Sequence, residues 1–92
     1  MLEKQIERHL VDVIRDSGGR AYKWVSPGRA GVPDRLVILP GGRITAVECK
    51  APGKKTTRAQ EAAIAELRGL GLSVLVVDNL EEIDRLFGVK HA

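Results

Sequence analysis

Two carboxylates, Asp34 and Glu48, are separated by two apolar runs and a Pro-Gly-Gly turn. Apolar, β-branched runs on either side of a glycine turn predict a β-hairpin, because glycine supplies the positive φ angles of tight turns. If residues 40–42 form the loop, the strands pair Asp34 with Glu48 and bring their Cβ atoms to roughly 5 Å. Lys50 follows Glu48 by two residues and therefore shares its face of the strand.

This arrangement could hydrolyse a phosphodiester. Two carboxylates at such a distance raise each other's pKa unless a cation lies between them. Oxygen ligands suit Mg²⁺ or Mn²⁺, and a neighbouring lysine can orient water or neutralise charge on a phosphate. The alternative is a surface salt bridge between Lys50 and Asp34 or Glu48, which is the common role of an acid near a lysine.

The residues around the acids resemble a known family. Their pattern is similar to that of the PD-(D/E)xK nuclease superfamily and, more narrowly, to the virus-type replication-repair nuclease (VRR-NUC) domain. The resemblance rests on Gly31-Val32-Pro33-Asp34-Arg35, on Val47-Glu48-Cys49-Lys50-Ala51-Pro52-Gly53-Lys54 and on Gln60. It extends from Glu3 to about Phe87, so residues 1–92 are expected to form a single domain.

The resemblance implies roles for these residues. Asp34, Glu48 and the main-chain carbonyl of Cys49 would bind the metal, and Lys50 would position or activate the attacking water. Because Cys49 alternates to the opposite face of the strand, its side chain is expected in the core rather than as a nucleophile. Gln60 would border the site.

The sequence leaves two further roles open. Members of the superfamily often place an acid from the first helix beside the metal, and either Glu3 or Glu7 could match it; an acid there also favours the helix dipole. Gln60 also completes a capping box with Thr57. Its capping and active-site roles are compatible only if the side chain turns inward.

Composition limits the other possibilities. The chain has 92 residues, of which 43% are hydrophobic and 29% charged, values typical of globular proteins. It shows no run long enough for a membrane span and no signal peptide at its N-terminus, so a cytoplasmic location is expected. The single cysteine excludes an internal disulfide, and the wide separation of His9 and His91 argues against a histidine zinc site.

Basic residues are concentrated between residues 20 and 58. This segment carries nine Lys or Arg and only two acids, which are Asp34 and Glu48. Such a segment suits a polyanionic partner such as DNA, although a solvated basic hairpin without a partner is the alternative. The candidate phosphate contacts are Lys23, Arg29, Arg35, Lys54, Lys55 and Arg58.

Periodicity predicts an α/β fold with the order α-β-β-β-α-β-α and a mixed four-stranded sheet. Three strands form an antiparallel meander, and a right-handed crossover helix leads to a parallel fourth strand that is expected to be buried on both faces. Trp24 is expected to pack in the core rather than to stack on a base. The predicted elements are helix 2–17, strand 20–25, the hairpin strands around 40–42, a helix from 57 to about 69, strand 73–77 and helix 80–87, with residues 78–79 as its cap.

The expected function is therefore a metal-dependent DNA endonuclease. Stand-alone relatives from phages and bacteria resemble dimeric resolvases of four-way (Holliday) junctions, which predicts a homodimer in a bacterial cell or a phage-infected host. The alternatives are a nuclease acting on flaps or duplex DNA, and a DNA-binding module of the same fold without catalysis. The same motifs would be compatible with each.

Overall fold

A computed structural model describes residues 1–88 of the chain, so His91 lies outside the described residues. The order of elements is α-β-β-β-α-β-α, as predicted. The elements are α1 (Glu3–Asp16), β1 (Arg20–Lys23), β2 (Arg35–Leu39), β3 (Arg43–Cys49), α2 (Arg58–Gly69), β4 (Ser73–Val77) and α3 (Leu80–Phe87).

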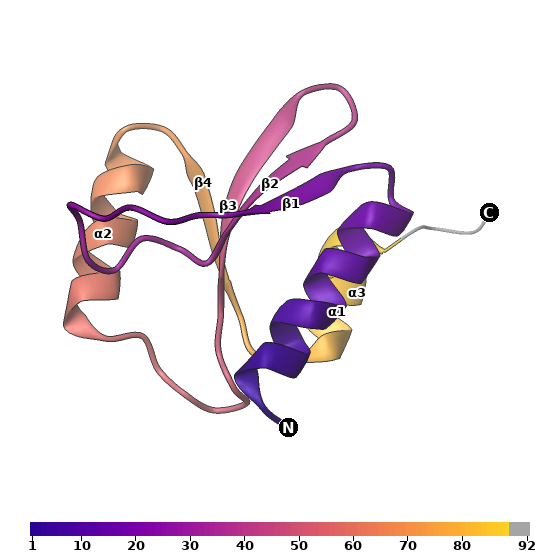
Figure 1. Ribbon diagram of the computed structural model, residues 1–92, viewed down its shortest axis with the longest axis horizontal. Helices are drawn as coiled ribbons and strands as arrows, with labels where there is room; N and C mark the ends of the chain where they lie inside the picture. Colours follow the sequence, from indigo (N-terminus) through magenta and orange to yellow (C-terminus); the bar gives the residue numbers. More distant parts are fainter. Residues whose placement is uncertain (89–92) are drawn as a thin grey trace.

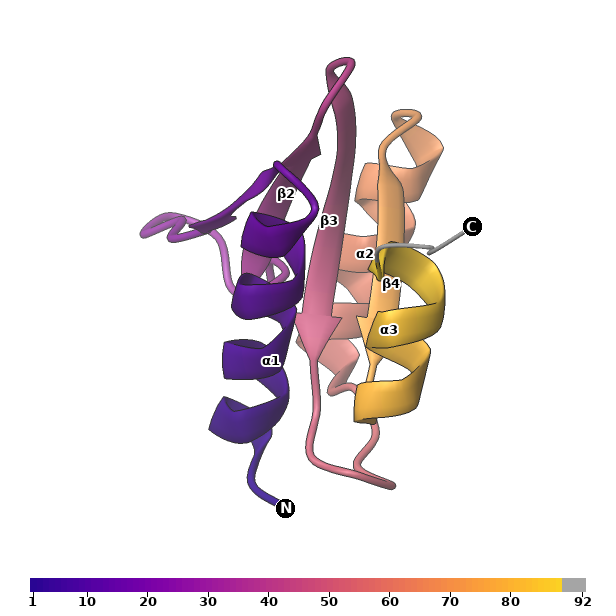
Figure 2. The same ribbon diagram turned by 90° about the vertical axis from the view of Figure 1, so that its right-hand side faces the viewer.

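The strands form one mixed sheet with the order β1-β2-β3-β4. The first three strands are antiparallel neighbours, and β4 runs parallel to β3 after the α2 crossover. Helices α1 and α3 cover one face of the sheet and α2 covers the other (Figures 1 and 2). The predicted fold class is therefore confirmed.

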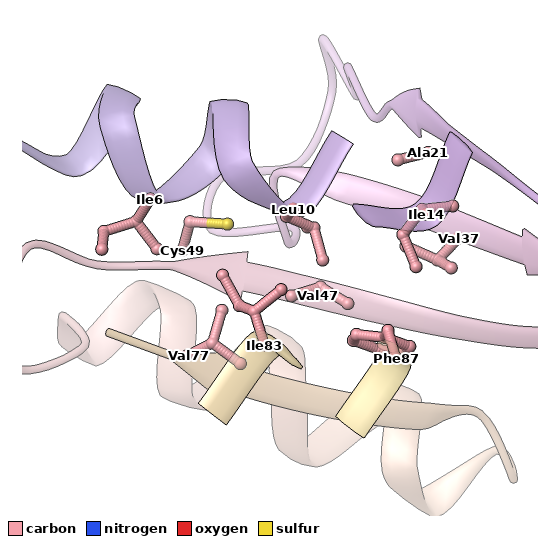
Figure 3. Packing of buried hydrophobic residues seen from close by; sticks show 10 residues of the cluster. All are labelled: Ile6, Leu10, Ile14, Ala21, Val37, Val47, Cys49, Val77, Ile83 and Phe87. Carbon is pink, nitrogen blue, oxygen red and sulfur yellow. The ribbon is translucent and has the colours of Figure 1, made fainter. Parts of the chain in front are cut away.

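Helix α1 forms because its apolar residues recur at helical spacing. Ile6, Leu10 and Ile14 are four residues apart and each is 0% exposed. They pack with residues of the sheet and of α3 in the main core cluster (Figure 3). Leu2, within the predicted helix 2–17, precedes α1 as its N-cap and is 58% exposed.

A smaller cluster lies on the α2 face of the sheet. Ala46, Ile64 and Val74 are buried there, and the partly buried Trp24 packs against them. The prediction that Trp24 belongs to the core is confirmed. Helix α2 begins with the predicted capping box, in which the Thr57 side chain accepts a hydrogen bond from the Gln60 N–H.

The hairpin has the predicted register. Leu39 pairs with Arg43 and Arg35 pairs with Val47, and Gly41 and Gly42 adopt φ angles of 87° and 82° in the loop between the strands. Because the register is fixed along the whole hairpin, Asp34 lies at the open end of the ladder, next to Glu48.

Two strands differ from their predicted form. Strand β1 ends at Lys23 instead of Val25, although the Trp24 N–H still donates to the Asp34 carbonyl at 2.9 Å. The prediction that β4 is buried on both faces is wrong for Val76, which is 37% exposed. Strand β4 is an edge of the sheet, and its continuous apolar run does not reveal this position. No helix within residues 1–88 has the length and apolar character to cross a membrane.

Candidate active site

Asp34 and Glu48 meet at the open end of the hairpin, on the α2 face of the sheet. Asp34 immediately precedes β2, and Glu48 lies near the end of β3. The Asp34 carboxylate accepts a hydrogen bond from the Cys49 N–H, with an N–O distance of 2.8 Å. Because the N–H and C=O of a strand residue face the same neighbouring strand, the Cys49 carbonyl also faces the Asp34 side.

The Glu48 carboxylate is almost completely buried, with a residue exposure of 1%. Its Oε2 atom accepts a hydrogen bond from the Gln60 amide at 3.0 Å and lies 3.5 Å from the Lys50 Nζ. Its Oε1 atom is buried without a hydrogen-bond partner among residues 1–88. A buried oxygen without a partner is unfavourable, so this oxygen is available to a cation.

Lys50 lies on the same face as Glu48, as its spacing predicted. It is 8% exposed, and its main-chain N–H donates to the Val77 carbonyl at 2.9 Å, which fixes the end of β3 against β4. The ammonium group lies 3.5 Å from the Glu48 carboxylate in a partly dehydrated environment. There it can orient a water molecule or stabilise negative charge on a substrate.

Gln60 combines its two predicted roles. Its Oε1 atom accepts the Thr57 N–H at 2.8 Å as a helix cap, while its Nε2 atom donates to Glu48. The side chain is turned inward, which is the condition under which both roles are compatible. Gln60 thus connects the first turn of α2 to the acidic pair.

Gly31 brings the loop that precedes Asp34 against the start of α2. Its φ angle is 84°, and a Cβ atom there would lie 2.4 Å from the Ala59 carbonyl oxygen. The absence of a side chain at Gly31 therefore leaves room for the first turn of α2.

Burial and mutual repulsion shift the titration of both acids. Burial, assisted by the charge of Asp34 and opposed by Lys50, raises the pKa of Glu48 from 4.5 to about 7. Burial also raises the pKa of Asp34, although the hydrogen bond from Cys49 opposes this. The pKa of the Cys49 thiol is raised by burial, so the thiol stays neutral and packs in the core, as predicted.

These residues fit a divalent cation. The two carboxylates, one of which has an unpartnered oxygen, and the nearby Cys49 carbonyl provide the hard oxygen donors that Mg²⁺ or Mn²⁺ prefers. Within residues 1–88, no group of three or more His, Cys, Asp or Glu side chains is placed to hold a metal ion. Magnesium commonly binds through one or two carboxylates together with water and substrate phosphates.

The two helix acids occupy different environments. Glu7 is engaged in a partly buried ion pair, with its Oε2 atom 2.7 Å from the Arg35 Nε, and Arg35 also donates to the Ala21 carbonyl. Glu3 is exposed in the first turn of α1. The charge of Glu3 contributes to raising the pKa of Glu48, and that of Glu7 contributes to raising the pKa of Asp34.

The candidate phosphate contacts divide into two groups. The Arg35 side chain is 20% exposed and already paired with Glu7, so its geometry argues against the predicted contact with phosphate. Arg29 is exposed and pairs with Glu66 of α2. Lys23, Lys54, Lys55 and Arg58 are exposed.

Asp78 makes a contact that the sequence did not predict. It was expected to cap α3 together with Asn79, but the side chain of Asn79 alone caps α3, by accepting the Glu82 N–H. Asp78 instead accepts a hydrogen bond from the Gly53 N–H at 3.0 Å. The parallel register of β3 and β4 could have revealed this contact, because it places the residues after both strands side by side.

The comparison with protein families agrees with this geometry. The sequence profile of the VRR-NUC domain matches residues 1–79, which is most of the chain. The chain belongs to the VRR-NUC family. A solved structure described as a VRR-NUC domain superposes with a TM-score of 0.85 at 33% sequence identity, covering 91% of each chain.

The chain is also similar to a phage protein. The protein named "Putative nuclease p44", from Acyrthosiphon pisum secondary endosymbiont phage 1, is 58% identical over 77 residues. The match covers 84% of this chain and 83% of the relative. The two chains are therefore of similar extent as well as similar sequence.

Proposed function

We propose that this VRR-NUC chain is a metal-dependent, structure-specific DNA endonuclease that cleaves four-way junctions in the manner of a Holliday-junction resolvase. Membership of the VRR-NUC family supports nuclease activity on DNA. The observation that carries the metal-dependent chemistry is the buried Glu48 carboxylate, which has an unpartnered oxygen and lies beside Asp34 and Lys50. In this proposal residues 1–92 act as one nuclease domain.

The side chains divide the work of hydrolysis. Asp34, Glu48 and the Cys49 carbonyl would hold Mg²⁺ or Mn²⁺, which when bound polarises the phosphate and activates water. Lys50 orients the attacking water and stabilises the additional negative charge of the transition state. Gln60 holds the Glu48 carboxylate in place, and Glu3, which is not engaged in an ion pair with Arg35, is the helix acid better placed to assist through water.

The exposed lysines and arginines would bind the DNA backbone. Lys23, Lys54, Lys55 and Arg58 are free to contact phosphates, and Arg29 could exchange its surface pair with Glu66 for a phosphate. A two-fold dimer would unite two such basic surfaces and present two sites at a fixed separation. A four-way junction is itself roughly two-fold, so paired nicks would follow from the matching symmetry.

The metal site predicts a pH-dependent gain in stability. At pH 8, adding Mg²⁺ or Mn²⁺ should raise the melting temperature, by about 4–8 °C for each kcal/mol of binding free energy. At pH 5.5 the rise should shrink, because Glu48, with a pKa of about 7, must lose a proton before it can bind the ion. Differential scanning fluorimetry at matched ionic strength measures this. An equal rise with NaCl alone would contradict a specific site.

The substrate is tested with a panel of labelled DNA structures. Duplex, flap, fork and immobile four-way junction should be compared in Mg²⁺ and Mn²⁺, with the solution mass measured in parallel. We expect a dimer and paired nicks in opposing strands of the junction. A monomer at micromolar concentration, or flap cleavage without paired junction nicks, would remove the resolvase assignment and leave a nuclease of other specificity. Tight binding without any cleavage would indicate a non-catalytic module of the same fold.

In this proposal the protein acts in the cytoplasm of a bacterial cell or a phage-infected host. The similarity to a phage-encoded protein supports this setting. Both settings contain replicating DNA, from which branched structures arise.

A further inference from the structure

A short basic turn follows Lys50 directly. In residues 51–54 the Lys54 N–H donates to the Ala51 carbonyl at 3.0 Å, and Gly53 has a φ angle of 78°. Proline followed by glycine with positive φ is the pattern of a type II β-turn. The turn leaves Lys54 and Lys55 exposed at the end of the sheet that carries Asp34, Glu48 and Lys50.

The end of β4 anchors this turn. The Asp78 Oδ2 atom accepts the Gly53 N–H at 3.0 Å, and its Oδ1 atom accepts a hydrogen bond from the Asn79 side chain at 3.0 Å. Asn79 is itself fixed as the N-cap of α3. Figure 2 shows the segment after β3 passing below the end of β4, next to the start of α3. The turn is thus attached to two elements that do not carry the acidic pair.

We propose that Asp78 is a positioning residue. It holds the turn of residues 51–54, and with it Lys54 and Lys55, in the conformation that binds a DNA phosphate. The inference rests on the proposed nuclease function and adds to it a residue that does not itself touch the substrate. An anchored turn has less conformational entropy to lose on binding than a free loop, so its lysines bind phosphate more tightly. Without the anchor, substrate affinity should fall while the chemistry at Asp34, Glu48 and Lys50 stays intact.

The sign of the effect separates positioning from simple electrostatics. Removing an acid from a DNA-binding protein should strengthen binding, because the repulsion of phosphates decreases. Loss of the anchor should weaken binding. Asp16→Ala is a matched control, because Asp16 is an exposed acid at the far end of α1 (Figure 1) and has no part in the turn.

The experiment compares Asp78→Ala, Asp78→Asn and Asp16→Ala in steady-state cleavage of a labelled junction with Mg²⁺. Asp78→Ala should raise KM roughly threefold to tenfold at unchanged kcat, because this factor corresponds to the free energy of one lost hydrogen bond. Asp78→Asn keeps an oxygen acceptor for Gly53, so its KM should stay at or below that of the wild type, as for Asp16→Ala. Should Asp78→Ala fail to fold, Asp78→Ser replaces it, because the serine side chain is shorter than aspartate and reaches less far toward Gly53.

A second measurement tests whether the effect acts through the lysines. In a Lys54→Ala/Lys55→Ala background, Asp78→Ala should raise KM no further. An equal rise in that background, or a KM for Asp78→Ala that matches Asp16→Ala, would overturn the inference while wild-type cleavage still supports the proposed function. A wild-type protein that neither binds nor cleaves DNA would overturn both.

Discussion

Asp34→Asn should reduce the rate of DNA cleavage by roughly three orders of magnitude or more and leave the fold intact. Asparagine is nearly isosteric with aspartate, and its carbonyl oxygen can still accept the Cys49 N–H that Asp34 accepts at 2.8 Å. The substitution removes only the negative charge that a cation and its activated water require. Single-turnover cleavage of a labelled junction at saturating protein measures the loss in the chemical step.

The choice of asparagine makes the experiment specific. Asp34→Ala would also leave the Cys49 N–H without its acceptor at the end of β3, so a loss of activity could reflect local disorder. Asp16→Asn removes one exposed acid elsewhere and should cleave like the wild type. Cleavage by pure Asp34→Asn within about tenfold of the wild-type rate would exclude Asp34 as a ligand.

Glu48→Gln should make the metal-free protein more stable at pH 8 while abolishing cleavage. A carboxyl group whose pKa is raised from 4.5 to about 7 costs the folded state on the order of 3 kcal/mol at pH 8. Glutamine removes this cost and can still accept the hydrogen bond from Gln60. Because the pKa of about 7 already includes the opposing attraction of Lys50, the net gain should be of this order and measurable as a rise in melting temperature.

The direction of the Glu48 pKa shift determines how the stability of the folded protein depends on pH. Since the folded pKa of Glu48 lies above the unfolded value, its contribution is favourable below about pH 4.5 and is lost as the pH rises through about 7. The advantage of Glu48→Gln should therefore be small near pH 5 and increase toward pH 8. The variant should also lose the rise in melting temperature with Mg²⁺. Thermal denaturation in EDTA and in Mg²⁺ at both pH values tests both statements, and a variant less stable than the wild type in EDTA at pH 8 would contradict them.

Most of the fold could be predicted because local patterns and tertiary requirements agree. The helical spacing of Ile6, Leu10 and Ile14, the glycine turn between β2 and β3 and the capping box at Thr57 each specify their element without long-range information. The hairpin register followed from the loop position alone. The exposure of Val76 did not follow, because an apolar strand gives no information about whether it lies inside the sheet or at its edge.

The candidate site was predictable only where it depends on the hairpin. The juxtaposition of Asp34 and Glu48 and the shared face of Lys50 follow from strand geometry. The pairing of Arg35 with Glu7, and of Arg29 with Glu66, depends on how helices pack across the sheet. From the sequence alone, a basic residue can bind a DNA phosphate or form an ion pair with an acid that is distant in the chain. Only the packing of the elements decides which of the two it does.

The two hydrogen bonds of the Gln60 side chain couple the candidate site to the N-terminus of α2. The same side-chain amide closes the first turn of the helix and donates to Glu48, so fraying of that turn also removes this hydrogen bond from the carboxylate. Local unfolding at the helix N-terminus and loss of this hydrogen bond at the site are then coupled. A ligand that binds Glu48 should therefore also stabilise the first turn of α2 through Gln60.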